Sequence, residues 1–209
     1  TAGMPSAFLC PLLVPSSLRL PAPVNQALGS PLNTINAMLK EATHSDAEQI
    51  ANLVNKAYRP EPGERGWTHE SELVAGQRIN TEQVASLINE RGSVLVAYEG
   101  DSLMGCVHIE QAEPYCYIGM LATMPYLQNR GLGKKLLAAA ENLAVSRYGA
   151  QGFKMSVLSS RPELLAYYER RGYSLTGSSH PYPAEAGVGQ PLDANLEVLE
   201  LIKPRQASA

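Results

Sequence analysis

The sequence predicts an α+β domain in which helices cover a mixed β-sheet. Three observations support this: strand-like and helix-like runs are intermingled along the chain, turn residues separate them, and 209 residues suffice for one domain with a sizeable core. The predicted order is one strand, two helices, three strands, a helix, a strand, a helix and two strands. Such an order favours one sheet with helices packed against it.

The first predicted elements are a short strand over Lys40 to Thr43 and a helix after it. Ser45 and Glu48 have the spacing of a capping box, which marks a helix start. Thr81 is the predicted cap of a second helix. The first helix has one apolar face, formed by Ile50, Leu53, Val54 and Ala57.

The second half of the chain is patterned more regularly. Strands are predicted at 93–99, 103–110, 115–123, 153–159, 173–176 and 196–203, and helices at 133–148 and 160–171. Gly100-Asp101 makes a hairpin turn between the first two of these strands. Ser160 and Glu163 form a second capping-box spacing, and Gly172 ends the helix that follows.

The first 37 residues differ from the rest, because they hold six prolines and Arg19 as their only charged residue. Prolines exclude a helix or a central strand there. We expect an N-terminal extension over 1–37, either packed or flexible, or translated upstream sequence before a start at Met38. Thr1-Ala2-Gly3 resembles residues left by cloning. The domain proper then covers 38–209.

Composition excludes several function classes. The net charge of −3 does not suit a nucleic-acid binder, and no apolar run approaches the roughly 20 residues that span a bilayer. Cys10, Cys106 and Cys116 are an odd number without a CxxC pair, which argues against a disulfide framework or a zinc site. We therefore expect a cytoplasmic protein that binds no metal, nucleic acid or membrane.

A glycine-rich loop, Gln128-Asn129-Arg130-Gly131-Leu132-Gly133, joins a predicted strand to a predicted helix. A helix N-terminus offers free N–H groups, and glycines let a phosphate approach them. Arg130, Lys134 and Lys135 add positive charge there. The loop is not a Walker A motif, nor a dinucleotide fingerprint, whose third glycine would fall at Leu136. It predicts a phosphate site; a tight turn with solvated lysines is the alternative.

A second segment makes the reading specific. Tyr167-Tyr168-Glu169-Arg170-Arg171-Gly172-Tyr173 looks like the aromatic-Tyr-Glu-Lys/Arg-x-Gly-aromatic segment of the GNAT superfamily of N-acetyltransferases, and the loop from Gln128 to Gly133 matches that superfamily's Q/R-x-x-G-x-G/A signature. The resemblance extends from about Met38 to Lys203. It implies a GNAT fold, with the mixed central sheet splayed at its fourth strand and helices on both faces.

The resemblance also implies a cofactor site for acetyl-CoA, which serves as cosubstrate, and no metal. The backbone of Leu121, Ala122 and Thr123 would hold the pantetheine and polarise the thioester. Backbone amides from Gln128 through Lys134 would grip the pyrophosphate. The amine would attack directly, so neither of the two strand cysteines would be a nucleophile. Arg161 occupies a position where many members have an asparagine that contacts CoA, and it would meet a phosphate instead.

Catalytic groups follow from the chemistry. An alkylammonium has a pKa near 10, so a base must remove a proton, and the departing thiolate needs an acid. Tyr168 matches the superfamily's usual acid; a packed core aromatic is the alternative. Glu110, at the end of a strand, is our candidate base, with His108 on the same strand face. A solvated strand end and a satisfied histidine are the alternatives.

For the acceptor site, the resemblance points to the region between the first two helices and to a late loop. The candidates for substrate binding are Trp67, Glu70, Arg78 and His180, each of which can equally be a structural residue. We expect transfer of an acetyl group to a primary amine of a small molecule or peptide. The alternatives are a CoA-binding regulatory or interaction module, and transfer of another acyl group. A homodimer is possible, because many relatives dimerise.

Overall fold

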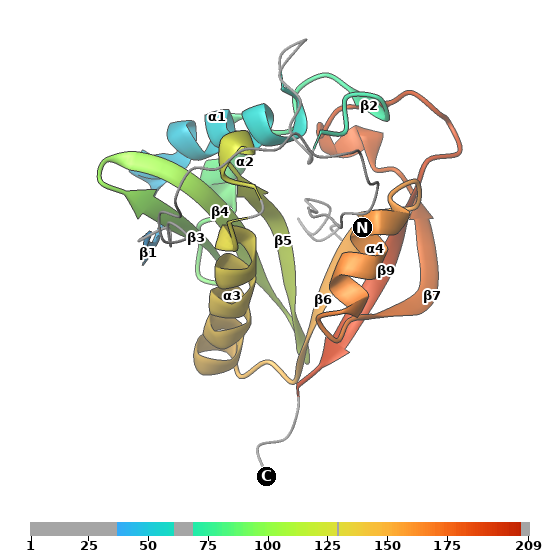
Figure 1. The fold of residues 1–209 in the computed structure, drawn as a ribbon. Helices are drawn as coiled ribbons and strands as arrows, with labels where there is room; N and C mark the ends of the chain where they lie inside the picture. Colours follow the sequence, from blue (N-terminus) through green and yellow to red (C-terminus); the bar gives the residue numbers. More distant parts are fainter. Residues whose placement is uncertain (1–36, 61–68, 129, 206–209) are drawn as a thin grey trace, which may run out of the picture.

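The computed structural model describes residues 37–60, 69–128 and 130–205 (Figure 1). Two predicted site residues, Trp67 and Asn129, and nearly all of the expected extension over 1–37 lie outside the described residues. Seven strands form one sheet in the order β1-β3-β4-β5-β6-β9-β7. Their bounds are β1 Met38–Glu41, β3 Gly92–Glu99, β4 Ser102–Ala112, β5 Tyr115–Thr123, β6 Gly152–Leu158, β7 Ser174–Pro181 and β9 Glu197–Pro204.

The sheet consists of two antiparallel arms that meet at one parallel pair. Strands β1, β3, β4 and β5 form the first arm, and β6, β9 and β7 form the second. β5 and β6 pair through only two residues each, Cys116 with Phe153 and Tyr117 with Lys154. Beyond this joint the two strands diverge, as Figure 1 shows. The splay predicted beside the fourth strand is therefore confirmed, since β5 is that strand.

The joint itself is closely packed. A Cβ atom at Gly152 would lie 2.7 Å from the Lys203 carbonyl oxygen and 3.0 Å from the Tyr115 ring. Only glycine fits there without displacing backbone. The closed end of the sheet is thus fixed by close approach of β5, β6 and β9.

Helices cover both faces of the sheet. α1 (Ala47–Tyr58) and α2 (Thr81–Ser86) pack on one face, and α3 (Leu132–Tyr148) and α4 (Pro162–Glu169) on the other (Figure 1). β3 shows the alternation that divides two cores: Leu95 faces α3, whereas Val94 faces α1. The predicted α+β class with helices on both faces is confirmed.

Two predicted helix caps are wrong, by two residues before α1 and by one residue before α2. The capping box before α1 is formed by Thr43 and Asp46 rather than by Ser45 and Glu48: the Asp46 carboxylate accepts the Thr43 N–H at 2.8 Å, and a short 3-10 turn, η1 (His44–Asp46), precedes α1. For α2 the cap is Asn80, whose side chain accepts the Gln83 N–H at 2.8 Å. In both places the capping side chain lies one or two residues before the predicted one.

The start of α4 is also corrected. The helix begins at Pro162, because proline suits the first helical position, and Glu163 bonds the Arg161 side chain instead of closing a box with Ser160. Gly172 ends the helix as predicted: its φ is 86°, and its N–H donates to the Glu169 carbonyl. The structure adds features that were not predicted: two short turns, η2 (Pro125–Leu127) and η3 (Ala184–Ala186), and a two-stranded pair of β2 (Val74–Ala75) with β8 (Gln190–Pro191).

Candidate functional site

A β-bulge interrupts β5 where it leaves β6. Between the pairs Cys106–Ala122 and His108–Gly119, β4 advances by two residues and β5 by three. Met120 takes up the extra residue with φ of 48°, in the left-handed region that side chains rarely adopt. Sequence reasoning missed this bulge, although a glycine inside a strand, here Gly119, is a known signal for one.

The bulge is held on the α1 side. The Tyr58 hydroxyl donates to the Leu121 carbonyl at 3.3 Å, and the Cys106 thiol lies 3.6 Å from the Met120 carbonyl oxygen. Both Leu121 and Ala122 are buried, at 1 % and 0 % exposed. These contacts fix the backbone of β5 at the level where the two arms separate.

At the end of β5, the backbone N–H and C=O groups of one residue point toward the diverging β6 rather than toward β4. The Met124 N–H donates to the Met104 carbonyl at 3.0 Å, across the β4–β5 ladder. Because backbone groups alternate in direction along a strand, those of Thr123 point to the opposite edge. The buried Thr123 hydroxyl has no hydrogen-bond partner in the described part of the chain. Thr123 belongs to the segment that the sequence predicts to hold the pantetheine, and that prediction remains to be tested.

The glycine-rich loop leads into the N-terminus of α3. Gly131 caps the helix with φ of 81°, and the first intrahelical bond runs from the Lys135 N–H to the Gly131 carbonyl at 3.1 Å. The N–H groups of Leu132, Gly133 and Lys134 therefore lie at the open end of the helix. No acidic side chain lies in this first turn. The arrangement is that of an anion site at a helix N-terminus.

Two other predicted amides of this loop are used locally. The Gln128 N–H bonds the Pro125 carbonyl and the Arg130 N–H bonds the Leu127 carbonyl, each at 3.3 Å. The set of amides expected to grip a pyrophosphate thus narrows to those of the first helical turn. Arg130 and Lys134 are exposed and contribute charge with their side chains.

On the second arm, α4 carries two predicted residues. Arg161 lies at its N-cap, 6 % exposed, with its Nε bonded to the Glu163 carboxylate. Tyr168 is fully buried and makes edge-to-face contacts with Tyr167 and Tyr173, with centroids 5.1 and 5.7 Å away. The rings fix the orientation of the Tyr168 side chain.

The two strand cysteines are unsuited to nucleophilic chemistry. Burial raises the pKa of the Cys106 thiol to about 12 and that of the Cys116 thiol to about 11. Both therefore stay protonated at neutral pH, and the thiolate is the nucleophilic form. This supports the expectation that neither forms an acyl-enzyme.

Glu110 and His108 share the face of β4 opposite α3. Burial raises the pKa of the half-buried Glu110, against the opposing effect of Arg91, and its Oε2 has no hydrogen-bond partner among the described residues. Burial lowers the pKa of His108 to about 4, which makes its imidazole neutral at physiological pH. Glu110 stands opposite Tyr117 in the β4–β5 register, next to the joint of the two arms.

The predicted acceptor residues Glu70 and Arg78 lie in one buried cluster together with Arg59, which sequence reasoning missed. Arg59 Nη1 lies 3.2 Å from Glu70 Oε2, and the Arg78 guanidinium lies over the Tyr58 ring at 5.3 Å. Glu70 and Arg78 are each 3 % exposed. Tyr58 links this cluster to the Leu121 carbonyl on β5.

The late loop reaches the cluster through Tyr182 rather than His180. His180 is exposed on β7, opposite Val198. The Tyr182 hydroxyl donates to the Val188 carbonyl at 2.7 Å. Burial raises the pKa of Tyr182, while the charges of Arg78 and Arg59 act in the opposite direction.

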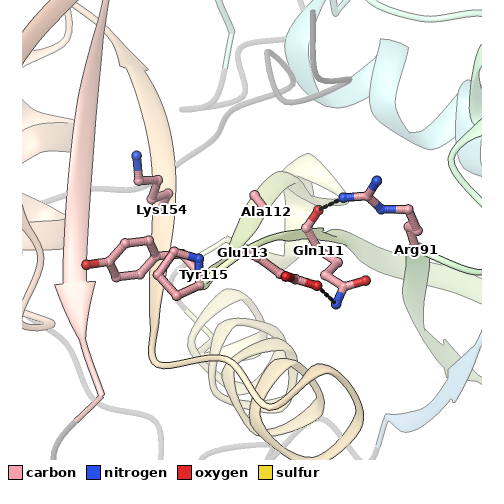
Figure 2. Close-up of a pocket in the computed structure, with 7 residues that line it drawn as sticks. Arg91, Gln111, Ala112, Glu113, Tyr115 and Lys154 are labelled. Atoms are coloured by element: carbon pink, nitrogen blue, oxygen red, sulfur yellow. Dashed lines mark hydrogen bonds between the residues drawn. The ribbon is translucent and has the colours of Figure 1, made fainter. Parts of the chain in front are cut away.

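A shallow depression of about 870 Å³ lies at the β4–β5 hairpin, at the closed end of the sheet (Figure 2). Its charged groups are occupied: Arg91 donates to the Gln111 carbonyl, Gln111 donates to the Glu113 carboxylate, and Lys154 pairs with Glu200. Tyr115, at its wall, is roughly 25 Å along β5 from Thr123. The depression is separate from the site at the diverging end.

Within the described ranges, no group of three His, Cys, Asp or Glu side chains is placed to hold a metal ion. None of the helices in this part of the chain has the length and apolar character needed to cross a membrane.

Comparison with known proteins gives a family match. A model of the acetyltransferase (GNAT) domain matches residues 54–182. Comparison with curated proteins gave no match.

Solved structures share the fold at low identity. They include the IAA acetyltransferase from Bacillus cereus, 20% identical with a TM-score of 0.58 over 81% of this chain and 100% of that one. An N-acetyltransferase from Staphylococcus aureus is 15% identical, with a TM-score of 0.59 over 80% and 97%. An acetyltransferase of the GNAT family from Streptococcus pneumoniae is 16% identical, with a TM-score of 0.58 over 82% and 100%. With the family model spanning more than half of the sequence, on a splayed sheet that carries the signature loop at the start of α3, this chain belongs to the GNAT acetyltransferase family.

Proposed function

We propose that this protein transfers an acetyl group from acetyl-CoA to the primary amine of a small molecule or peptide. The observation that carries the proposal is the divergence of β5 from β6 after two register pairs, with the open N-terminus of α3 following β5. The arrangement offers an extended peptide edge and an anion site in succession. A cosubstrate with an extended pantetheine arm and a pyrophosphate needs both.

The residues present fit this cosubstrate. The N–H groups of Leu132, Gly133 and Lys134 would hold the pyrophosphate, with the side chain of Arg130 adding charge. The peptide edge at Thr123 would pair with the pantetheine amides, as a neighbouring strand does. Arg161 would approach a phosphate only if it exchanges part of its contact with Glu163.

Two side chains are proposed to move protons. Glu110 would accept a proton from the acceptor ammonium, directly or through water, because its raised pKa brings it nearer to the range useful for a base. Tyr168 would donate a proton to the departing thiolate. Acetyl-CoA supplies the activated acyl group, and the protein supplies orientation and proton transfer.

Two measurements test the proposal. The first is thermal unfolding with and without acetyl-CoA. At a concentration of roughly 100 times Kd, binding adds about 2.7 kcal/mol to the free energy of unfolding, so the melting temperature should rise by several degrees. Absence of a shift at millimolar acetyl-CoA rejects the cosubstrate.

The second measurement is release of free CoA thiol across a panel of primary amines. Amine-dependent release supports an enzyme. Binding of acetyl-CoA without release on any amine rejects the enzyme and favours a CoA-binding regulatory module. Faster release from a longer acyl-CoA than from acetyl-CoA would reject acetyl as the group transferred.

A further inference from the structure

A buried arginine lies on the α1 side of the splayed sheet, and one of its donors has no partner in the described ranges. The Arg59 side chain is 10% exposed and follows directly after the last residue of α1. Its Nε donates to the Gly76 carbonyl at 3.2 Å, and its Nη1 to the Tyr58 carbonyl at 3.0 Å and to Glu70. Its Nη2 is buried, and no hydrogen-bond partner for it is found among the residues that the structure describes.

The cluster carries more positive than negative charge. Among the described residues it contains two guanidiniums, those of Arg59 and Arg78, for the single carboxylate of Glu70. All three side chains are about nine-tenths buried or more. Water screens such charges poorly, so a carboxylate that reaches them interacts strongly. The phenol of Tyr182 lies beside them but donates its hydrogen to Val188.

The cluster is close to the place where we locate the acyl group. The ring of Tyr58 contacts the Arg78 guanidinium on one side, and its hydroxyl contacts the Leu121 carbonyl on the bulge. One tyrosine side chain therefore spans the distance between the cationic cluster and the backbone of β5. A small acceptor molecule, with only a few bonds between its carboxylate and its amine, can therefore reach from the cluster to the backbone of β5.

We propose that the acceptor is a small amino acid, whose carboxylate is bound by Arg59 and Arg78 while its amine faces the β5 bulge. Guanidinium suits this role because it can bind a carboxylate through two parallel hydrogen bonds, and Nη2 of Arg59 supplies a donor already desolvated. Glu70 holds Arg59 in place through Nη1. This inference rests on the proposed acetyl transfer and specifies its substrate.

The test compares matched acceptors. Glycine, β-alanine and γ-aminobutyrate carry the amine and the carboxylate at increasing separation, and the corresponding amides lack only the charge. We expect kcat/KM for the preferred amino acid to exceed that for its amide by about 10- to 100-fold, the effect of one charge-assisted hydrogen bond. Equal values for acids and amides overturn the inference and leave acetyl transfer standing.

Variants identify the residues responsible. Arg59→Gln should lower kcat/KM for the amino acid by about 10- to 100-fold and leave the value for the amide nearly unchanged. Arg78→Gln should act in the same direction. Lys56→Gln removes an exposed cation from α1, three residues away, and is the matched control. A loss of the same size in Lys56→Gln overturns the assignment.

Folding is controlled separately, since Arg59→Gln leaves Glu70 buried without its partner. The double variant Arg59→Gln/Glu70→Gln removes the charge pair together and should restore stability while the preference for the carboxylate stays lost. Acetyl-CoA should still raise the melting temperature of each variant. If short acidic peptides react faster than every free amino acid, the small-amino-acid acceptor is rejected. If no amine reacts at all, acetyl transfer fails before the inference is reached.

Discussion

The hydroxyl of Tyr168 lies on a fully buried ring and is the proposed proton donor. The adjacent Tyr167 on α4 serves as the control. Tyr168→Phe should lower kcat by about 100-fold or more, because a thiolate would leave without a proton donor, and should leave the Kd for acetyl-CoA nearly unchanged. Single-turnover kinetics and calorimetric binding separate the two quantities.

The control for this prediction is Tyr167→Phe. The Tyr167 hydroxyl is also buried, without a partner among the described residues, and its ring packs against Tyr168. Removing it alters packing in the same place but no proposed proton donor, so turnover should stay near the wild-type value. Equal turnover in wild type and Tyr168→Phe would reject Tyr168 as the acid.

Glu110 is expected to reduce stability while it contributes to catalysis. Its folded pKa is raised by burial, so the protonated form stabilises the fold below the ordinary pKa, and that contribution is lost as pH rises through the raised value. Glu110→Gln should therefore lower kcat by about 100-fold yet raise the melting temperature relative to wild type. The gain should be larger near pH 8 than near pH 5.

A melting-temperature difference that does not change between those pH values would contradict the burial of an ionised Glu110. The acidic limb of the pH–rate profile gives a second measurement, because it should be present in wild type and absent in the variant. His108 does not confuse the comparison, because its pKa of about 4 keeps it neutral throughout this range.

At the residue scale, the sequence predicted candidate catalytic residues better than it predicted which side chains contact one another. Tyr168 and Glu110 could be proposed because a motif or a strand end marks them. Arg59 could not, because its pairing with Glu70 spans eleven residues of sequence and depends on how the chain returns to the end of α1. The bulge at Met120 could not be predicted either, because the only local signal for it is the neighbouring Gly119.

At the element scale, α3 has a glycine in the left-handed conformation at each end. Gly131 has φ of 81° and Gly149 has φ of 62°, and an added Cβ would meet nothing within 4 Å at either position. Replacement by alanine should therefore cost roughly 1–2 kcal/mol of backbone strain at each site, measured by chemical denaturation. The two ends should differ in function.

Gly131→Ala should also weaken acetyl-CoA binding, because it shifts the amides that begin the helix, whereas Gly149→Ala should not. Calorimetric Kd values for the two variants provide the measurement. A similar Kd in both would show that the N-terminus of α3 does not hold the cosubstrate. Equal losses of stability would confirm that the two substitutions are matched.

Element boundaries show what a local pattern can and cannot determine. The strand predicted over 115–123 coincides with β5 at both ends. The start of α1 was less determined, because Thr43–Asp46 and Ser45–Glu48 both have capping-box spacing. The tertiary structure selects the former: the Tyr98 hydroxyl donates to Asp46 at 3.0 Å, and Lys40 pairs with the same carboxylate.

At the scale of the whole molecule, the splay of the sheet was predicted from the family resemblance and not from the periodicity of the sequence. Both β5 and β6 read as ordinary strands, and their separation after two register pairs is a property of how the arms pack. Helix α1 packs on the first arm, whereas α3 and α4 share one apolar cluster with strands of both arms. The arms share few backbone contacts, so the opening beyond the joint is where a ligand can cross-link them.

Hydrogen exchange should reveal that cross-linking. If acetyl-CoA lies between β5 and α4, binding should slow exchange of amides in both arms, over 121–134 and over the first turns of α4. At about 100 times Kd the slowing approaches roughly 100-fold for amides that exchange only through global unfolding. Exchange of the β7 amides at the outer edge should change less, because every residue of that edge strand is exposed and such strands can open locally without global unfolding. Protection confined to the first arm would mean that the ligand binds the α3 loop without bridging, and would reject the proposed role of the second arm.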